Sequence, residues 1–399
     1  MIPLKWLGFR RPTVQIIPPG WALLRLGEIS STKGGGRLGF TENDYKLEGF
    51  PSFCAGGQNG LVDIAEYEGE AVILSSIGEQ CGKAFYADGK WTTLANVQVI
   101  SPDLTKANCY YLWNLLNDRD FWPRAQTAQP YIRPSDIRKS WIVLPPKSEQ
   151  DQIALLFRAA DDAIVKAKVK LEAARVLKRS LTAELLQPTK GTHWDKTTFA
   201  SLVSEKIRNG YSPACPQDPT GAWVLSLDAL TDDGFNPHGV KPAPVEDKGL
   251  LPFRLLLDDI LVSRSNTPEL VGRSGRYIGT PEVAYYPDLM MRVRVNYDLV
   301  SPEFAEMLLQ SSNARRWLKS RASGTSGSMV KIKRRDIMSL PVLLPDTTQQ
   351  NEIVRAVSAA KGAFIAAENN LSALHRVKKS LLQNLLTGKI RIPEGVLNV

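Results

Sequence analysis

An internal repeat constrains this chain more than any other feature of its sequence. Residues 132–191 align without gaps to residues 332–391, at a constant shift of 200 positions. The two segments share identical residues along their whole length: Asp136/Asp336, Ile137/Ile337, Leu144/Leu344, Pro145/Pro345, Gln150/Gln350, Ile153/Ile353, Ala160/Ala360, Leu171/Leu371, Lys178/Lys378, Ser180/Ser380, Leu181/Leu381, Leu185/Leu385 and Leu186/Leu386. Matching at this density indicates duplication, so the fold should contain two similar halves.

Each copy begins with a short apolar run and continues into a long helical pattern. The runs at 141–144 and 341–344 are apolar and rich in β-branched residues, which is typical of buried strands. Prolines end both runs, and polar residues that suit a helix N-cap follow them: Ser148 in one copy, Thr347 and Thr348 in the other. About forty residues without an internal proline come next.

The long segments carry an apolar seam with alternating spacings of four and three, which is the coiled-coil period. The seam predicts a helix-pair interface made of Ile153, Phe157, Ile164, Leu171 and Leu181 with Ile353, Val357, Phe364, Leu371 and Leu381. Lysine interrupts it at the same place in both copies, Lys178 and Lys378. A core helix of a bundle is the simpler alternative, but forty residues would extend about 60 Å, longer than a small domain is wide. We therefore expect the helices to pair with each other, antiparallel if a pseudo-two-fold axis relates the halves, as a rod between two globular units.

The regions before the helices are predicted to be two mixed α/β units with many loops. Weak parallels connect them: the segment from Trp21 to Leu26 resembles that from Trp194 to Leu202, and 70–75 resembles 259–263. A Gly-basic pair follows each of the latter segments, and 111–116 and 303–309 look helical. The predicted fold class is therefore α/β (mixed), with two pseudo-symmetric domains separated by long antiparallel coiled-coil helices. The predicted boundaries are 1–146, 147–188 (central helix), 189–346 and 347–399 (C-terminal helix and tail).

Composition favours a reducing compartment and argues against a metal site. The four cysteines form no CxxC pair and the three histidines are scattered, so neither a zinc site nor a disulfide framework is expected. No run of about eighteen apolar residues occurs, which predicts a cytoplasmic protein without a membrane span. The formal net charge of +9 permits a polyanionic partner without requiring one.

Catalytic motifs are missing from the sequence. It contains neither a GxxxxGK[ST] phosphate loop nor a GxSxG elbow. An amino-methyltransferase would need an Asn/Asp-Pro-Pro-aromatic tetrad, and the nearest segment, 236–239, lacks the second proline and the aromatic residue. The glycines at 34–36 suit a flexible loop better than a phosphate cradle. The residues themselves therefore give little support for catalysis, and neither a metal nor a cofactor is expected.

Features typical of nucleic-acid binding are more evident in the sequence than catalytic motifs. Residues 307–335 contain no acidic side chain, carry eight basic ones, and have a small polar centre at 322–328 that would let backbone donors approach phosphates. A solvated basic surface loop is the alternative. In the second unit the candidate DNA-binding residues are Arg264, Asn266, Arg273, Arg321, Thr325, Ser326, Ser328, Lys331 and Lys333.

The first unit has an equivalent loop at 124–133, whose glutamines could contact adenine edges and whose Arg133 could contact guanine or phosphate. Its candidate DNA-binding residues are Lys33, Arg37, Gln58, Asn59, Lys83, Arg124, Gln126, Gln129 and Arg133. Each of them taken singly fits a turn as well as a base contact. Asn59-Gly60 in particular is a hairpin-turn signal.

The duplicated order resembles the specificity subunit of type I restriction–modification systems. The segments that carry the resemblance are 144–150 with Ile153, their echo at 344–350 with Ile353, and the helix ends at 178–186 and 378–389. The echo departs from the motif at Asp346 and Gln349. Nearly the full chain is covered, but recognition domains of this family vary too much for base-contacting residues to be carried over.

The resemblance implies a non-catalytic protein that recognises DNA. Each recognition domain would contact one half of an asymmetric bipartite site in double-stranded DNA, and the helices would fix their separation. Half-sites about one helical turn apart, ~34 Å, would place both domains on one face of the duplex. Methyltransferase (modification) subunits, two of them, would supply S-adenosylmethionine chemistry, and a translocating restriction nuclease subunit would join for cleavage. Two other hypotheses remain: a coiled-coil adaptor that binds proteins without DNA specificity, and an orphan methyltransferase.

Overall fold

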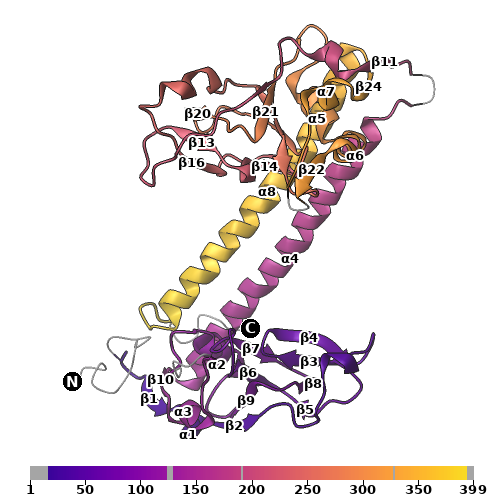
Figure 1. The fold of residues 1–399 in the computed structure, drawn as a ribbon. Helices are drawn as coiled ribbons and strands as arrows, with labels where there is room; N and C mark the ends of the chain where they lie inside the picture. Colours follow the sequence, from indigo (N-terminus) through magenta and orange to yellow (C-terminus); the bar gives the residue numbers. More distant parts are fainter. Residues whose placement is uncertain (1–16, 124–128, 190–191, 327–328, 393–399) are drawn as a thin grey trace. The chain divides into compact units, whose positions relative to one another are not determined.

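The structure is a computed structural model that describes residues 17–123, 129–189, 192–326 and 329–392. The chain forms two compact units (Figure 1). Unit 1 comprises Met1–Val169 with Asn369–Val399, and unit 2 comprises Lys170–Glu368. The long helices α4 (Lys147–Leu185) and α8 (Thr347–Leu385) each begin in one unit and end in the other, so the units are not bounded by the helix ends.

Unit 1 is built on two four-stranded sheets. The first is antiparallel, in the order β2-β9-β6-β7: β2 (Ser30–Gly34), β9 (Val97–Pro102), β6 (Ala71–Ser75) and β7 (Ala84–Ala87). The second has the order β4-β3-β8-β5: β4 (Gly57–Val62), β3 (Phe50–Cys54), β8 (Lys90–Thr93) and β5 (Tyr67–Glu68). All five residues of β6 are buried, as the unbroken apolar run predicts for a central strand. Helix α2 (Cys109–Leu116) packs on the first sheet.

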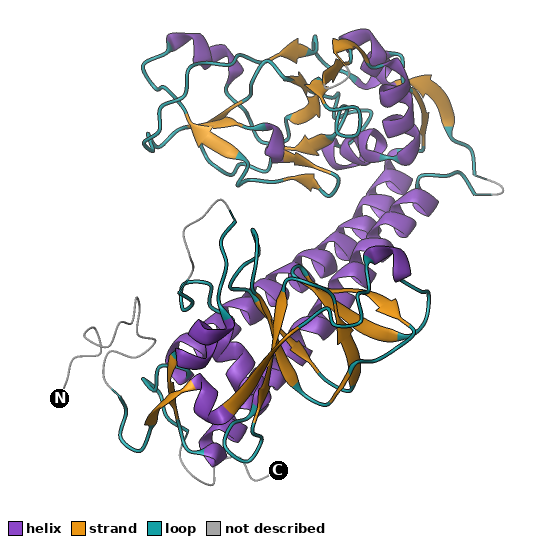
Figure 2. Cartoon of the chain, turned by 60° about the horizontal axis from the view of Figure 1, so that its bottom comes forward, coloured by secondary structure: helices purple, strands orange, loops and turns teal. Residues whose placement is uncertain are grey.

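Unit 2 repeats this plan with shorter strands (Figure 2). Its antiparallel sheet has the order β12-β21-β17-β19: β12 (Arg208–Asn209), β21 (Met290–Val293), β17 (Ile260–Ser263) and β19 (Ser274–Arg276). A second sheet has the order β16-β13-β20: β16 (Val240–Pro242), β13 (Trp223–Leu225) and β20 (Ala284–Tyr285). Smaller elements complete it: β14 (Leu230–Thr231), β15 (Gly234–Phe235), β18 (Ser265–Asn266), β22 (Ser323–Ser326), β23 (Met329–Lys331), α5 (Pro302–Gln310), α6 (Ser312–Arg321) and α7 (Arg334–Met338).

The turns that follow the two central strands, β6 and β17, have the same hydrogen bond and backbone conformation. Gly82 N donates to Ser75 O at 2.9 Å in unit 1, and Gly272 N donates to Ser263 O at 2.8 Å in unit 2. Both glycines have a left-handed backbone, with φ of 93° and 74°. That conformation explains why a glycine precedes the basic residue in each copy.

A two-strand pairing joins the beginning of each unit to the strand before its long helix. In unit 1, β1 (Ala22–Arg25) pairs antiparallel with β10 (Trp141–Leu144); in unit 2, β11 (Asp195–Thr198) pairs with β24 (Pro341–Leu344). Leu26 N donates to Ser140 O at 2.9 Å and Phe199 N donates to Leu340 O at 2.8 Å. The buried Leu26 therefore corresponds to Phe199 and not to Leu202, and the predicted alignment of these two segments is wrong at that end.

In the described part of the chain, six further short helical elements connect these strands and helices. They are α1 (Leu26–Ile29), η2 (Glu42–Asp44), α3 (Pro134–Lys139), η3 (Phe199–Leu202), η4 (Leu227–Ala229) and η5 (Lys248–Phe253).

Parts of α4 and α8 run antiparallel inside each unit. In unit 1, Glu149 pairs with Arg391, just beyond α8, and Asp161 pairs with Lys378, so residue numbers rise along one helix as they fall along the other. In unit 2, Leu186 shares a core with Ile353 and Val357, and Lys178 lies over the ring of Phe364.

Burial along the expected seam is uneven. Ile153, Phe157, Ile164, Ile353, Val357 and Phe364 are buried, whereas Leu171, Leu181, Leu371 and Leu381 are half-buried. Of the helices that the structure describes, none has a segment long and apolar enough to span a bilayer.

Candidate nucleic-acid interface

The basic segment 321–333 of unit 2 is hydrogen-bonded to the residues that directly follow the central strand β17. Strand β23 pairs with β18 and with β22, placing Lys331 opposite both Ser265 and Ser323. Ile332 N donates to Arg264 O at 2.9 Å, so Arg264 lies beside Lys331 and Lys333. The side chains of Lys331, Lys333 and Arg321 are exposed. These four basic residues, separated by up to 69 positions in sequence, therefore gather on one side of unit 2.

Not every predicted residue of unit 2 is available for such a contact. Asn266 is 7% exposed; its amide donates to Ser263 Oγ at 3.4 Å and accepts from Thr267 N at 2.9 Å. The side chain of Arg273 is held by Asp232, with bonds of 2.9 and 2.5 Å. Burial and these local partners speak against Asn266 as a base contact. Thr325 and Ser326 belong to β22, and Ser328 lies outside the described residues.

Unit 1 places its loop in the same way. Ile132 N donates to Ser76 O at 2.9 Å, the counterpart of the Ile332–Arg264 bond, and Tyr131 bridges to Ile77. Arg133 is exposed, donates to Tyr131 Oη at 3.0 Å and lies 5.6 Å from the centre of that ring. Gln129 is also exposed, whereas Arg124 and Gln126 lie outside the described residues.

The glycine run of unit 1 is closely packed. A Cβ on Gly35 would come within 2.6 Å of Thr93 and Val97, and one on Gly36 within 2.8 Å of Ala95. The glycines therefore allow the chain to approach the β8–β9 connection, and Gly34 belongs to β2, so the predicted loop begins only at Gly35. Lys33 and Arg37 on either side are exposed, while Lys83 is half-buried.

The Asn59-Gly60 pair does not form the predicted hairpin turn. The turn between β3 and β4 falls at Ala55-Gly56, and Asn59 and Gly60 lie within β4. Gly60 has φ of 78°, and a Cβ there would meet the Tyr45 ring at 2.4 Å, so glycine is required by packing. Gln58 and Asn59 are exposed, and Asn59 Nδ2 donates to Glu42 Oε1 at 3.3 Å.

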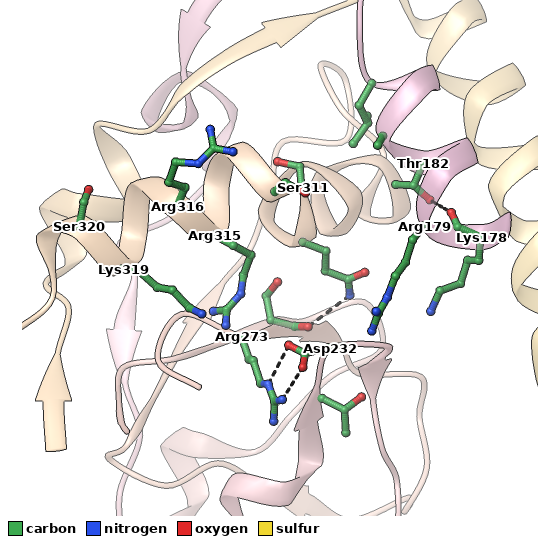
Figure 3. Close-up of a pocket in the computed structure, with 16 residues that line it drawn as sticks. Lys178, Arg179, Thr182, Asp232, Arg273, Ser311, Arg315, Arg316, Lys319 and Ser320 are labelled. Carbon is green, nitrogen blue, oxygen red and sulfur yellow. Dashed lines mark hydrogen bonds and ion pairs between the residues drawn. The ribbon is translucent and has the colours of Figure 1, made fainter. Parts of the chain in front are cut away.

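A basic pocket of about 850 Å³ in unit 2 was missed by sequence reasoning, apart from Arg273 (Figure 3). Its basic lining residues are Lys178, Arg179, Arg273, Arg315, Arg316 and Lys319. Arg315, Arg316 and Lys319 come from the stretch 307–335, whose lack of acidic residues indicated a basic surface. The other three come from segments that are distant in sequence. The described residues contain no group of three His, Cys, Asp or Glu side chains that could hold a metal ion.

The fold and these loops define a class: a duplicated α/β protein whose two units present unlike basic loops at equivalent places. Residues 18–173 match the family described as "Type I restriction modification DNA specificity domain".

Curated relatives carry the same description. The putative type I restriction enzyme MjaX specificity subunit of Methanocaldococcus jannaschii is 24% identical over 200 residues (49% of this chain, 45% of that protein). The EcoKI specificity subunit of Escherichia coli K12 is 26% identical over 279 residues (65% and 60%). The match thus spans less than two thirds of either of these relatives. The MjaVIII specificity subunit of M. jannaschii is 21% identical over 414 aligned positions, 94% of each chain.

Solved structures show the same fold. The crystal structure of the type I restriction–modification S subunit from M. genitalium superposes with a TM-score of 0.64 at 15% identity, covering 94% of this chain and 98% of that one. A chain from a study of assembly and conformational transition in the type I R-M system gives a TM-score of 0.54 at 15% identity, covering 94% and 100%. Residues 18–173 thus match the type I restriction–modification DNA specificity domain, and the fold of the chain is that of the solved S subunits.

Proposed function

We propose that this chain is the non-catalytic DNA-recognition subunit of a type I restriction–modification complex. Residues 1–146 and 189–346 would be its two target recognition domains, and residues 147–188 and 347–399 the helical spacers between them. The observation that carries the proposal is the duplicated loop placement: 129–133 and 329–333 are held by the same hydrogen bond to the exit of the central strand, yet differ in sequence. Equivalent positions with unlike side chains suit two different half-sites.

Charge supports DNA as the ligand. Lys331 and Lys333 are exposed and form no ion pair with any residue in the described part of the chain. Free cations on one surface release counterions from DNA when they bind phosphates, which gives sequence-independent affinity. In unit 1, Lys33, Arg37, Gln58, Asn59, Lys83, Gln129 and Arg133 would contribute, together with Arg124 and Gln126 of the same loop.

The proposed partners follow from the family. Two modification subunits would perform methyl transfer, and a translocating nuclease subunit would join them for restriction, all in the cytoplasm. The chain itself would hold no cofactor. Because the two units differ, the recognised site would be asymmetric and bipartite, with unrecognised base pairs between its halves.

Methylation mapping tests the proposal. The chain is co-expressed with its modification subunits, and methylated sites are located by sequencing genomic DNA. We expect one asymmetric bipartite sequence, and exchanging residues 189–346 for the same segment of a relative should change only one half of it. Absence of DNA binding at low salt, with or without the partners, would favour the protein-binding adaptor, and methyl transfer by the isolated chain would favour the orphan methyltransferase.

A further inference from the structure

The basic pocket of unit 2 lies between the end of α4, helix α6 and the strand connections around Asp232 and Ser274 (Figure 3). Six basic side chains and one carboxylate, Asp232, line it. Hydroxyl groups add further donors: Thr182, Thr231, Ser274, Ser311, Ser312 and Ser320. Cationic groups interleaved with hydroxyls suit an oxyanion ligand, because each phosphate oxygen accepts several hydrogen bonds.

Most of the positive charge in this pocket is uncompensated. Arg273 is paired with Asp232, and Lys178 with Asp233 at 2.7 Å. The guanidinium of Arg315 donates to two backbone carbonyl oxygens, Val271 O and Glu269 O, and to no carboxylate that the structure describes. Burial lowers the pKa of Arg315. The charge of Asp232, which is paired with Arg273, offsets this effect only in part. A partly buried cation with so little counter-charge is costly, and a bound anion would supply more.

Ser274 gives a second, independent indication. Its side chain is 1% exposed, it lines the pocket, and its Oγ has no hydrogen-bond partner among the described residues. Buried hydroxyls are normally satisfied, so this one is available to a ligand. Ser311 and Ser312 also bring the N-terminal end of α6 to the pocket, where the backbone N–H groups and the helix dipole favour an anion.

An apolar pocket of about 390 Å³ adjoins the basic one and shares Leu186 and Ser311 with it. Its walls include Trp317, Leu340 and Val342. Both volumes fall within the range of small-molecule sites, roughly 300–1,000 Å³. A ligand with a charged end and a flat apolar end would fill both.

We propose that these two pockets form a binding site for a nucleoside polyphosphate, with the phosphates among Arg179, Arg315, Arg316 and Lys319 and the ring in the apolar pocket. A duplex presents its phosphates on a convex surface, so it would reach the exposed rim residues but not Ser274. The site is therefore distinct from the proposed DNA interface at Arg264, Lys331 and Lys333, and its occupancy does not depend on that proposal.

Titration calorimetry of the full chain at low salt tests the site with ATP, GTP and inorganic tripolyphosphate as probes. We expect saturable one-to-one binding, with ATP or GTP at least 10-fold tighter than tripolyphosphate because only the nucleotides fill the apolar pocket. The triple variant Arg179→Gln/Arg316→Gln/Lys319→Gln removes three exposed charges and should weaken nucleotide binding at least 10-fold. The matched control Lys206→Gln/Lys241→Gln/Lys248→Gln removes three exposed charges elsewhere in unit 2 and should leave it unchanged.

Duplex DNA affinity is measured in parallel on the same proteins. An affinity for DNA that changes less than 2-fold in the triple variant supports a separate ligand site. Absence of saturable nucleotide binding, or equal weakening in the triple variant and the control, would overturn the proposal. Equal affinity for ATP and tripolyphosphate would overturn the assignment of the ring to the apolar pocket. Loss of DNA binding without any nucleotide binding would assign the pocket to the DNA footprint instead.

Discussion

Lys178 Nζ lies 2.7 Å from Asp233 Oδ1 and 4.8 Å from the centre of the Phe364 ring. Its repeat partner Lys378 has the same kinds of neighbour, an ion pair to Asp161 and the ring of Trp113 at 5.5 Å. Each seam lysine thus joins a carboxylate and an aromatic face inside its own unit. This arrangement explains why the apolar seam is interrupted twice at the same repeat position.

Replacing Lys178 with Met should destabilise unit 2 by about 1–3 kcal/mol, because among the described residues Asp233 then keeps only Arg175, at 3.6 Å, as an ion-pair partner. Chemical denaturation gives the change, and a double-mutant cycle with Asp233→Asn isolates the pair. Lys170→Met, at an exposed position on α4, is the control. Equal stability of the two variants would contradict the role assigned to the pair.

The repeated glutamines make a graded prediction. Gln150 donates to Pro145 O at 3.0 Å and Lys106 O at 3.2 Å and accepts from Asn108 N at 2.9 Å. Gln350 donates to Pro345 O and Leu299 O, both at 3.0 Å. At about 1 kcal/mol per bond, Gln150→Ala should cost about 2–3 kcal/mol and Gln350→Ala about 1–2 kcal/mol.

Urea unfolding measures both glutamine changes. Asp162→Ala and Glu352→Ala, at exposed positions of the same helices, are the controls and should change stability by less than about 0.5 kcal/mol. The reverse order of the two losses would show that the extra bond of Gln150 contributes nothing.

Removing Lys331 and Lys333 together should weaken DNA binding on every sequence, because phosphate contacts carry no base information. The slope of log K against log salt should fall by about 1.8 for two lost contacts. Titrations at several salt concentrations measure this slope, and Lys241→Ala is the control. An unchanged affinity and slope would remove this loop from the interface.

The pairing of Asp232 with Arg273 predicts a pH dependence. The hydrogen bond from Arg273 lowers the pKa of Asp232 below its ordinary value of 3.8. A lowered folded-state pKa adds stability that is complete above the unfolded pKa, about 3.9, and is lost as the pH falls through the folded value. Asp232→Asn should therefore be less stable than the parent at pH 7, and the difference should shrink below about pH 4.

Thermal unfolding at pH 7 and at pH 3 tests this dependence. Asp218→Asn changes an exposed carboxylate without an ion pair to any described residue, and it should show no such convergence. A stability difference for Asp232→Asn that is the same at both pH values would contradict the assignment.

Local sequence patterns predicted the long helices and the strands before them, but they did not predict which distant residues contact each element. The bounds of α4 and α8 follow from proline and heptad spacing. The predicted N-caps are wrong, because Ser148, Thr347 and Thr348 lie within the helices, and Asp346 caps α8 by accepting from Gln349 N at 2.9 Å.

The burial of Asn266 and the turn at Ala55-Gly56 could not be predicted from local sequence. Asn266 is covered by β23, and a side chain at Gly60 would collide with the Tyr45 ring. Those contacts join residues 15 and 64 positions apart.

The sequence by itself determined the duplication and the two long helices, because repeats and periodicity are properties of order along the chain. Only the tertiary structure decided which charges meet. The basic pocket takes Arg179 from the end of α4, Arg273 from a strand connection and Arg315 from α6. Their spacing in the sequence does not predict that they share a pocket. Burial and charge compensation depend on neighbours in space, so the partners of the seam lysines and the uncompensated cations of the pocket appear only once the chain is folded.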